Sequence, residues 1–240
     1  MADPTVPAIH MREVTKDYRA LRPLRVRDLD LFPGESVALL GFDRAAAEVF
    51  VNLITAATLP DAGRIEIFGR RTTDIQDADT WLSSLDGFGI LSDRQVLLDN
   101  MTAEDNLTMP LTMALHDVGR GIRARVAALA QEVGLRSDEL RRPIVTLTPE
   151  FRMRVRLGRA LAPDPRILLS EHPNASLGAA DLAHFAEDYA RIVAGRRITS
   201  VVFTADAAFA SAIAPRVFTL QPATGELKSP FAWRRLFHRP

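Results

Sequence analysis

The chain has 240 residues, of which 30 are Lys or Arg and 30 are Asp or Glu, so no net charge draws it toward nucleic acid or an anionic membrane. Apolar residues make up 47% and charged residues 25%, which excludes the disordered and fibrous classes and indicates a globular protein with a sizeable core. The absence of cysteine excludes disulfides, thiolate metal sites and cysteine nucleophiles, and is typical of a reducing, cytoplasmic setting.

The sequence of the first quarter of the chain predicts three strands, then a turn and a helix. Strands are expected at residues 9–14, 29–32 and 35–40, the last directly after the Pro33-Gly34 turn. Gly41 ends the third strand. Helical sequence then runs to residue 54, and Asp43 stands at the position of an N-cap.

The remainder predicts an α/β protein with a parallel central sheet and a helical insertion. The expected elements are a turn at 60–63, a strand at 64–68, helices between 102 and 140, a helix at 152–161, a strand at 166–170, a helix at 182–193 and a strand at 198–203. The strand at 166–170 contains the apolar run Ile167-Leu168-Leu169, which suits a strand covered on both faces. The last three of these elements form a strand–helix–strand unit, as in doubly wound folds.

Several sequence segments, at the spacing found in the family, resemble motifs of the ATP-binding subunits of ABC transporters. They are Val14-Thr-Lys-Asp-Tyr18, which is similar to the loop that stacks an aromatic ring on adenine, Pro33-Gly34-Glu35, residues 98–107 and residues 155–161 with Pro165. The resemblance covers residues 8–226 and leaves a tail at 227–240. It implies a P-loop NTPase-like ABC ATPase core with an N-terminal antiparallel β subdomain and an α-helical subdomain at about residues 95–160.

The phosphate-binding loop departs from the family pattern. Aligned from Gly41, the Lys that meets the phosphates falls on Ala47, and the Ser or Thr that holds Mg²⁺ falls on Glu48. Arg44 and Ala46 replace two glycines. A methyl cannot neutralise phosphate, a carboxylate repels it, and non-glycine residues resist positive φ, so we expect tight Mg·ATP binding to be lost.

The start of the predicted helix offers acidic groups in place of a phosphate. We expect Asp43 to cap the helix and Glu48 to lie near its positive N-terminal end. Ordinary helix capping at a surface predicts the same weak nucleotide affinity. Arg44 is a candidate substitute cation, and Tyr18 either stacks on a purine or packs against its own domain.

The resemblance implies further losses at the catalytic positions. Glu171 stands at the Walker B strand end where an Asp orients the Mg²⁺ shell, and it could still reach a metal. His172 stands where a Glu polarises water, Ser92 at the Q-loop position and Ala205 at the switch histidine. We therefore predict no catalytic residue among these four, although His172 could in principle accept a proton.

The signature segment reads Leu147-Thr148-Pro149-Glu150-Phe151 in place of LSGGQ. Thr148 keeps a hydroxyl, Pro149 removes an N–H donor, and Glu150 adds negative charge where the γ-phosphate of the opposing subunit should bind. A subunit pair that contains this chain would therefore have both shared ATP sites impaired.

These observations predict a degenerate ABC ATP-binding-like subunit, defective in ATP hydrolysis, that acts structurally or as a regulator of a permease or of an active ABC ATPase. No cofactor is expected, although weak ATP and Mg²⁺ binding could persist. Two alternatives stay open: a slow or unorthodox ATPase using Glu171, His172 and Arg44, and a module in which Tyr18 holds a nucleoside without phosphates. The transported substrate and the oligomeric state are not readable from these residues.

The expected location is cytoplasmic and peripheral on the inner face of the cell membrane, through a partner. No apolar stretch approaches the roughly 20 residues of a membrane span, and the N-terminus lacks a signal-peptide pattern. Apolar side chains in residues 98–111 could line a permease groove or belong to the core; they are Met101, Leu107, Met109 and Leu111. The aromatic and basic tail could contact a membrane, a partner or its own domain.

Overall fold

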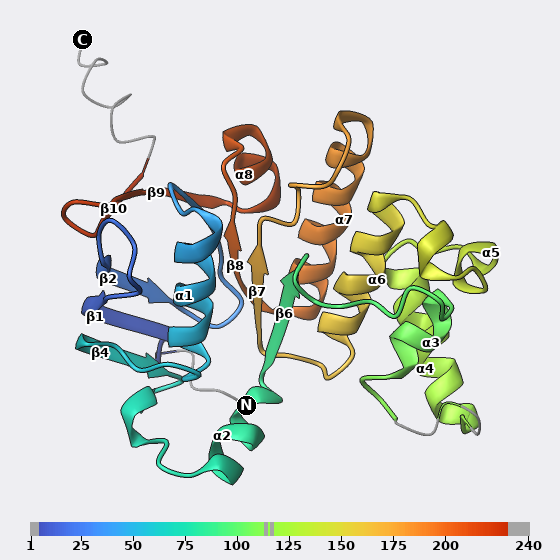
Figure 1. Cartoon of the computed structure of the whole chain (residues 1–240), viewed down its shortest axis with the longest axis horizontal. Coiled ribbons are helices and arrows are strands. Elements are labelled where there is room, and N and C mark those ends of the chain that lie inside the picture. Colours follow the sequence, from blue (N-terminus) through green and yellow to red (C-terminus); the bar gives the residue numbers. More distant parts are fainter. Residues whose placement is uncertain (1–4, 113–114, 116–117, 230–240) are drawn as a thin grey trace.

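The computed structural model describes residues 5–112, 115 and 118–229, so most of the tail lies outside the described residues. An antiparallel sheet in the order β2-β1-β4-β5 forms one end of the molecule (Figure 1). Its strands are β1 (Ile9–Lys16), β2 (Leu24–Leu31), β4 (Ala62–Ile67) and β5 (Arg70–Arg71). The expected N-terminal antiparallel β subdomain is thereby confirmed.

A second sheet runs through the middle in the order β10-β9-β3-β8-β7-β6. Its strands are β3 (Ser36–Leu40), β6 (Phe88–Ser92), β7 (Ile167–Glu171), β8 (Thr199–Phe203), β9 (Arg216–Gln221) and β10 (Glu226–Lys228). Every pairing among β9, β3, β8, β7 and β6 is parallel, and β10 alone pairs antiparallel. The carboxyl ends of the parallel strands therefore meet at one edge, where α/β proteins bind ligands.

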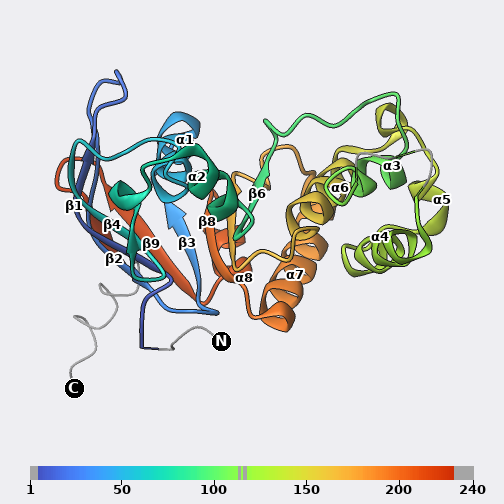
Figure 2. The ribbon, with the colours of Figure 1, turned by 90° about the horizontal axis from the view of Figure 1, so that it is seen from below.

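The helices divide into a core set and an outlying set. The core set is α1 (Arg44–Ile54), α2 (Ala78–Leu85), α7 (Ala179–Arg196) and α8 (Ala207–Ile213). The other set is α3 (Ala103–Thr108), α4 (Arg120–Glu132), α5 (Ser137–Leu140) and α6 (Pro149–Leu161), with short 3₁₀ turns at Thr72–Asp74 and Ile144–Thr146. Figure 2 shows α3, α4 and α5 at the end of the molecule away from β1 and β4.

Alternate residues of the central strands supply two separate cores. Leu39, Leu169 and Phe203 face the side shared with α1 and the antiparallel sheet, and Phe203 packs edge-on against Phe50 of α1 with ring centroids 5.2 Å apart. Their neighbours Leu168 and Val202 face the helical side. Burial of both faces explains why these strands read as unbroken apolar runs.

Several element boundaries differ from the sequence expectation. The strand expected at 29–32 begins at Leu24, because Leu24 and Val26 are buried in alternation with arginines. The helix expected at 152–161 begins at Pro149, since Thr148 caps it and proline suits a first helical position. The elements that sequence reasoning did not predict are β5, β6, β9, β10, α2 and α8, most of them short or amphipathic segments whose pattern is set by packing.

Gly63 supplies a test of the antiparallel sheet. It has a φ of +88°, and a Cβ placed on it would lie 2.4 Å from the backbone oxygen of Glu13. Gly63→Ala is therefore expected to lower the free energy of unfolding by about 2 kcal/mol or more in urea titration. The matched control is Gly195→Ala, where nothing lies within 4 Å and helix α7 should gain roughly 0.5–1 kcal/mol. Equal effects at both positions would contradict the predicted strain.

Candidate functional site

A turn through Gly41 joins β3 to α1. Gly41 has a φ of +84°, and a Cβ there would lie 3.1 Å from the carbonyl oxygen of Leu220. Asp43 caps α1, and its carboxylate accepts a hydrogen bond from the Ala46 N–H at 2.7 Å, which confirms the expected N-cap. Ala47, at the position of the phosphate-binding Lys, is fully buried in the core beneath α1.

Glu48 does not lie where the sequence analysis placed it. It is the fifth residue of α1, and the first turn contains no acidic residue, so the expectation that it fills the positive end of the helix is wrong. Its carboxylate instead pairs with the Arg94 guanidinium, with Nη1 and Oε1 2.5 Å apart. The charge of Glu48 is therefore met by a side chain and not by the helix dipole.

Arg94 joins this carboxylate to the Walker B position. Its Nη2 lies 2.6 Å and 2.7 Å from the two carboxylate oxygens of Glu171, and its Nε donates to Oε2 at 3.0 Å. Ser92 donates its hydroxyl to the same Oε2 at 2.8 Å. One guanidinium thus meets the residues at the phosphate-loop and Walker B positions, and the Q-loop residue completes the group.

The Arg94 cluster is defined as Glu48, Ser92, Arg94 and Glu171. All of these except the buried Ser92 line a cleft of about 250 Å³. The Glu171 side chain is almost buried, whereas Arg94 and Glu48 are nearly half exposed. Burial lowers the pKa of Arg94, but hydrogen bonds and charges from Glu171, Glu48 and Asp93 outweigh it and raise the pKa. The guanidinium therefore stays charged at every physiological pH.

Arg44, the candidate substitute cation, has a different partner. Its Nη1 lies 3.0 Å from a carboxylate oxygen of Asp93. Asp93 and Arg94 were both missed by sequence reasoning. One signal in the sequence could have indicated them. Glu48 and Glu171 are two acidic residues at positions that face the metal in the family, so a nearby cation is needed to compensate their charge. Arg94, two residues after the Q-loop position, is such a cation.

This arrangement does not fit a Mg²⁺ ion. In phosphate-loop NTPases the metal takes its protein ligands from the loop Ser or Thr and from the Walker B acid. Here the side chains at both positions form ion pairs with Arg94, and a divalent cation would have to displace or closely approach that guanidinium. Among the described residues, no group of three or more His, Asp or Glu side chains is placed to hold a metal ion.

His172 directly follows the carboxyl end of β7, and Ala205 lies just beyond the carboxyl end of β8. His172 has a φ of +45° and donates its backbone N–H to the Phe203 oxygen at 2.9 Å. Its Nε2 is buried and has no hydrogen-bond partner in the described part of the chain. Ala205 is exposed beside Asp206, which caps α8.

Tyr18 is half-buried and lines a separate pocket of about 210 Å³ together with Gly41 and Asp43. Burial and the nearby Asp43 carboxylate raise the pKa of its hydroxyl. The ring also packs against the core below α1. The pocket is smaller than the range of about 300–1,000 Å³ that is usual for small-molecule sites.

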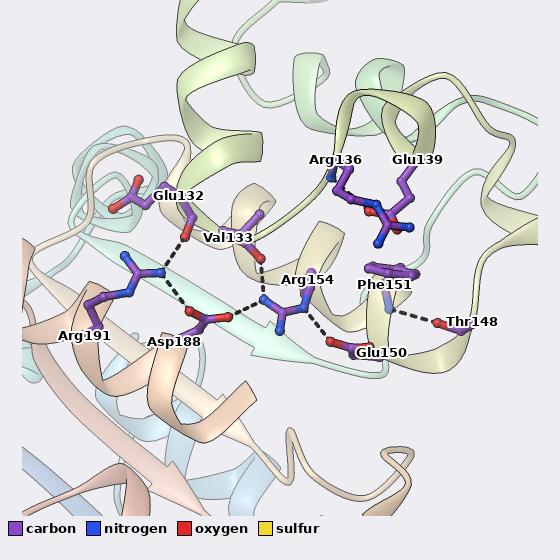
Figure 3. A network of polar contacts seen from close by, with 10 residues as sticks. All are labelled: Glu132, Val133, Arg136, Glu139, Thr148, Glu150, Phe151, Arg154, Asp188 and Arg191. Atoms are coloured by element: carbon purple, nitrogen blue, oxygen red, sulfur yellow. Dashed lines mark hydrogen bonds and ion pairs between the residues drawn. The ribbon is translucent and has the colours of Figure 1, made fainter. Parts of the chain in front are cut away.

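The signature-like residues form the start of α6. The Thr148 hydroxyl accepts from the Phe151 N–H at 3.4 Å, and Pro149 is the first helical residue. Arg136 lies over the Phe151 ring, 5.7 Å from its centroid. Glu150 turns toward Arg154, and the carboxylate accepts from Nε at 2.8 Å (Figure 3).

Arg154 continues this network into the core. Its Nη1 donates to the Asp188 carboxylate at 2.6 Å and to the Val133 carbonyl at 2.8 Å, and Arg191 reaches Asp188 from the other side (Figure 3). Burial lowers the pKa of Arg154, but the hydrogen bonds and charges of Asp188 and Glu150 outweigh this effect, so the pKa is raised overall. The negative charge of Glu150, expected to face a phosphate, is therefore compensated within this chain.

The apolar residues proposed to line a permease groove do not share one environment. Leu107 is fully buried in the core, whereas Met101, Met109 and Leu111 are half-buried. Across the described residues, none of the helices combines the length and apolar character needed to cross a bilayer.

Comparison with known proteins identifies relatives of known class. A family described as ABC transporter matches residues 24–175. The phosphonates import ATP-binding protein PhnC of Anaeromyxobacter dehalogenans (strain 2CP-C) is 30% identical over 200 residues, which span 80% of this chain and 40% of PhnC. The sulfate/thiosulfate import ATP-binding protein CysA of Pseudomonas aeruginosa (strain PAO1) is 30% identical over 218 residues, covering 89% of this chain and 64% of CysA. The chain thus spans about two fifths of the length of PhnC.

Solved structures share the fold at lower identity. The dimeric structure of MJ0796, a bacterial ABC transporter cassette, has a TM-score of 0.76 at 22% identity and covers 92% of this chain and 98% of its own. CbiO1 from Clostridium perfringens, part of the ABC transporter complex cbiONQ, has a TM-score of 0.80 at 17% identity and covers 96% and 91%. The architecture is therefore the ABC ATPase cassette, and the chain belongs to the ABC transporter family.

Proposed function

We propose that this chain is a non-hydrolysing ABC-type subunit that serves as a structural or regulatory partner of a membrane permease or of an active ABC ATPase. The observation that carries the proposal is the Arg94 cluster. A guanidinium bound to both Glu48 and Glu171 supplies internally the positive charge that Mg²⁺ brings to a working site.

Two further features support loss of hydrolysis. The phosphate-binding Lys is replaced by Ala47, whose methyl is buried in the core, so no cation from this position reaches a phosphate. At the signature segment, Pro149 has no N–H to offer a partner's nucleotide, and Glu150 is committed to Arg154. His172, Ser92 and Ala205 complete the set of altered positions.

The partner and the location are part of the same proposal. The relatives' names describe import ATP-binding proteins, and CbiO1, a solved structure with the same fold, is part of an ABC transporter complex. We accordingly place this chain in the cytoplasm, on the inner face of the cell membrane and attached through its partner. Residues 8–226 would form the docking unit, with the helical subdomain at about 95–160 and residues 227–240 as an appended tail.

Calorimetric titration of the full chain with Mg·ATP tests the proposal. Without the Lys contact and with the Arg94 cluster in place, we expect no binding heat and no thermal stabilisation up to about 1 mM nucleotide, with a nonhydrolysable analogue behaving identically. Binding with a Kd of about 10⁻⁶ M would overturn the proposal and favour the unorthodox ATPase. Thermal stabilisation by adenosine but not by ATP would instead favour the nucleoside module held by Tyr18.

A further inference from the structure

A third and larger cavity, of about 490 Å³, lies away from the Arg94 cluster, near the other ends of the same strands. Its wall contains Phe88, the first residue of β6, and Arg166, which immediately precedes β7, whereas Ser92 and Glu171 are the last residues of these strands. Figure 1 shows α2, which also lines the cavity, near the lower ends of the central strands. The cavity therefore opens at the opposite edge of the sheet from the nucleotide-site remnant.

The cavity is largely apolar. Its apolar lining comes from the end of α1, the β4–β5 hairpin, the loop before α2 and the start of β6, namely Ile54, Ile67, Phe68, Ile75 and Phe88. The volume falls within the range of about 300–1,000 Å³ that small-molecule sites usually have. A compact apolar group would therefore fit among these side chains.

Two arginines, Arg70 and Arg166, stand at this apolar wall. The Arg166 guanidinium lies 3.3 Å from the centre of the Phe68 ring, and within the described part of the chain neither Arg166 nor Arg70 forms an ion pair. Of the two acidic residues in the lining, Asp164 is already paired with Arg125 and Arg196. The pKa of Asp77 is lowered by hydrogen bonds from Thr80 and also by the charge of Arg70, so Arg70 has a carboxylate near it outside the lining. Arg166 is therefore the cation of the lining that is available to a ligand, and Asp86 is the acidic residue of the lining that forms no ion pair within the described residues.

Backbone strain and an unsatisfied hydroxyl point to the same place. Seven non-glycine residues have positive φ in the described part of the chain, and Ala56, Phe68 and Asp164 all line this cavity. Such strain concentrates at ligand sites. Thr72, also in the wall, has a buried hydroxyl with no hydrogen-bond partner, and a ligand or an ordered water would satisfy it most simply.

We propose that this cavity binds a small amphipathic carboxylate, with an aromatic or branched apolar body against Phe68 and Phe88 and the carboxylate on Arg166. The planar guanidinium pairs with a carboxylate in a bidentate geometry while it remains stacked on the ring. This site shares no residue with the Arg94 cluster.

Trp81 provides an intrinsic reporter for the test. Its indole Nε1 donates to the carbonyl of Thr55, which lines the cavity, at 2.9 Å. The chain has two tryptophans, so Trp233→Phe leaves Trp81 alone. We expect 4-phenylbutyrate to change the Trp81 emission saturably with a Kd of about 10⁻³ M, and the neutral 4-phenylbutan-1-ol to bind about tenfold more weakly.

Variants separate this site from general hydrophobic binding. Arg166→Gln should weaken 4-phenylbutyrate about tenfold and leave the alcohol unchanged, while Arg123→Gln, on the exposed face of α4, should change neither. Ser83→Phe, which fills the cavity from α2, should abolish binding of both at an unchanged melting temperature. Equal affinity for acid and alcohol, indifference to Arg166→Gln, or no binding to about 20 mM by fluorescence and saturation-transfer NMR would overturn the proposal.

Discussion

Replacing Arg94 by Ala is expected to create a divalent-cation site, whereas the described residues of the unmodified chain offer none. The change removes the guanidinium from between Glu48 and Glu171 and leaves two carboxylates on the cleft, with the buried Ser92 hydroxyl hydrogen-bonded to Glu171. Oxygen ligands of this kind bind Mn²⁺ or Ca²⁺. We expect calorimetry to give a Kd of about 10⁻⁴ to 10⁻³ M for Mn²⁺, against no binding by the unmodified chain.

The same substitution should couple stability to metal. Because Glu171 is nearly buried, losing its cation should lower the free energy of unfolding by about 1–3 kcal/mol, a value below that of a fully buried pair because Arg94 is half exposed. Mn²⁺ at 100 times its Kd should restore about 2.7 kcal/mol. Urea titration with and without Mn²⁺ measures both effects. Mg·ATP affinity should stay absent, since Ala47 is unchanged.

Arg44→Ala is the matched control for this experiment. Arg44 lines the same cleft, but it pairs with Asp93 and not with Glu48 or Glu171. Its removal should therefore leave Mn²⁺ binding undetectable. A site gained equally by both variants, or by neither, would show that Arg94 does not hold the carboxylates in the way the cluster implies.

Arg154→Met should produce the largest loss of stability in the chain's signature region. Methionine keeps most of the apolar length, but it leaves Glu150, Asp188 and the Val133 carbonyl without their shared donor (Figure 3). Removing one member of a buried charged network costs about 3–5 kcal/mol. We expect a decrease of that size in the free energy of unfolding at pH 7, measured in urea.

The effect of Arg154→Met should depend on pH. Burial raises the pKa of Asp188, but hydrogen bonds from Arg191 and Arg154 more than offset this and lower the pKa. A lowered native pKa gives stability that is present above the unfolded value of about 3.9 and is lost as the pH falls through the native value. The difference between the two proteins should therefore shrink at acid pH.

Arg191→Met isolates the exposed part of the same network. Arg191 contacts Asp188 at 2.9 Å, but its side chain is 59% exposed, so its loss should cost about 1 kcal/mol or less. If Arg154→Met lowers the free energy of unfolding no more than Arg191→Met does, the buried guanidinium does not stabilise the packing of α6 against α7 in the way proposed.

The local pattern of the sequence determined the class of the fold and the altered chemistry of the site. Apolar runs at β3, β7 and β8 predicted buried parallel strands, and Asp43 before a helical segment predicted the cap that forms. The loss of the phosphate-loop Lys at Ala47 is likewise a statement about residue identity. Such features depend on neighbours in the chain and are readable without tertiary contacts.

Only the tertiary structure decided which charges meet. Glu48, Arg94 and Glu171 come from α1, the loop after β6 and the end of β7, and sequence spacing says nothing about which cation pairs with which carboxylate. Glu150 pairs with Arg154 one helical turn along α6, but only the fold brings Asp188 of α7 to the same guanidinium. Short elements such as β5 and α8 were also missed, because their conformation depends on packing against distant segments more than on local propensity.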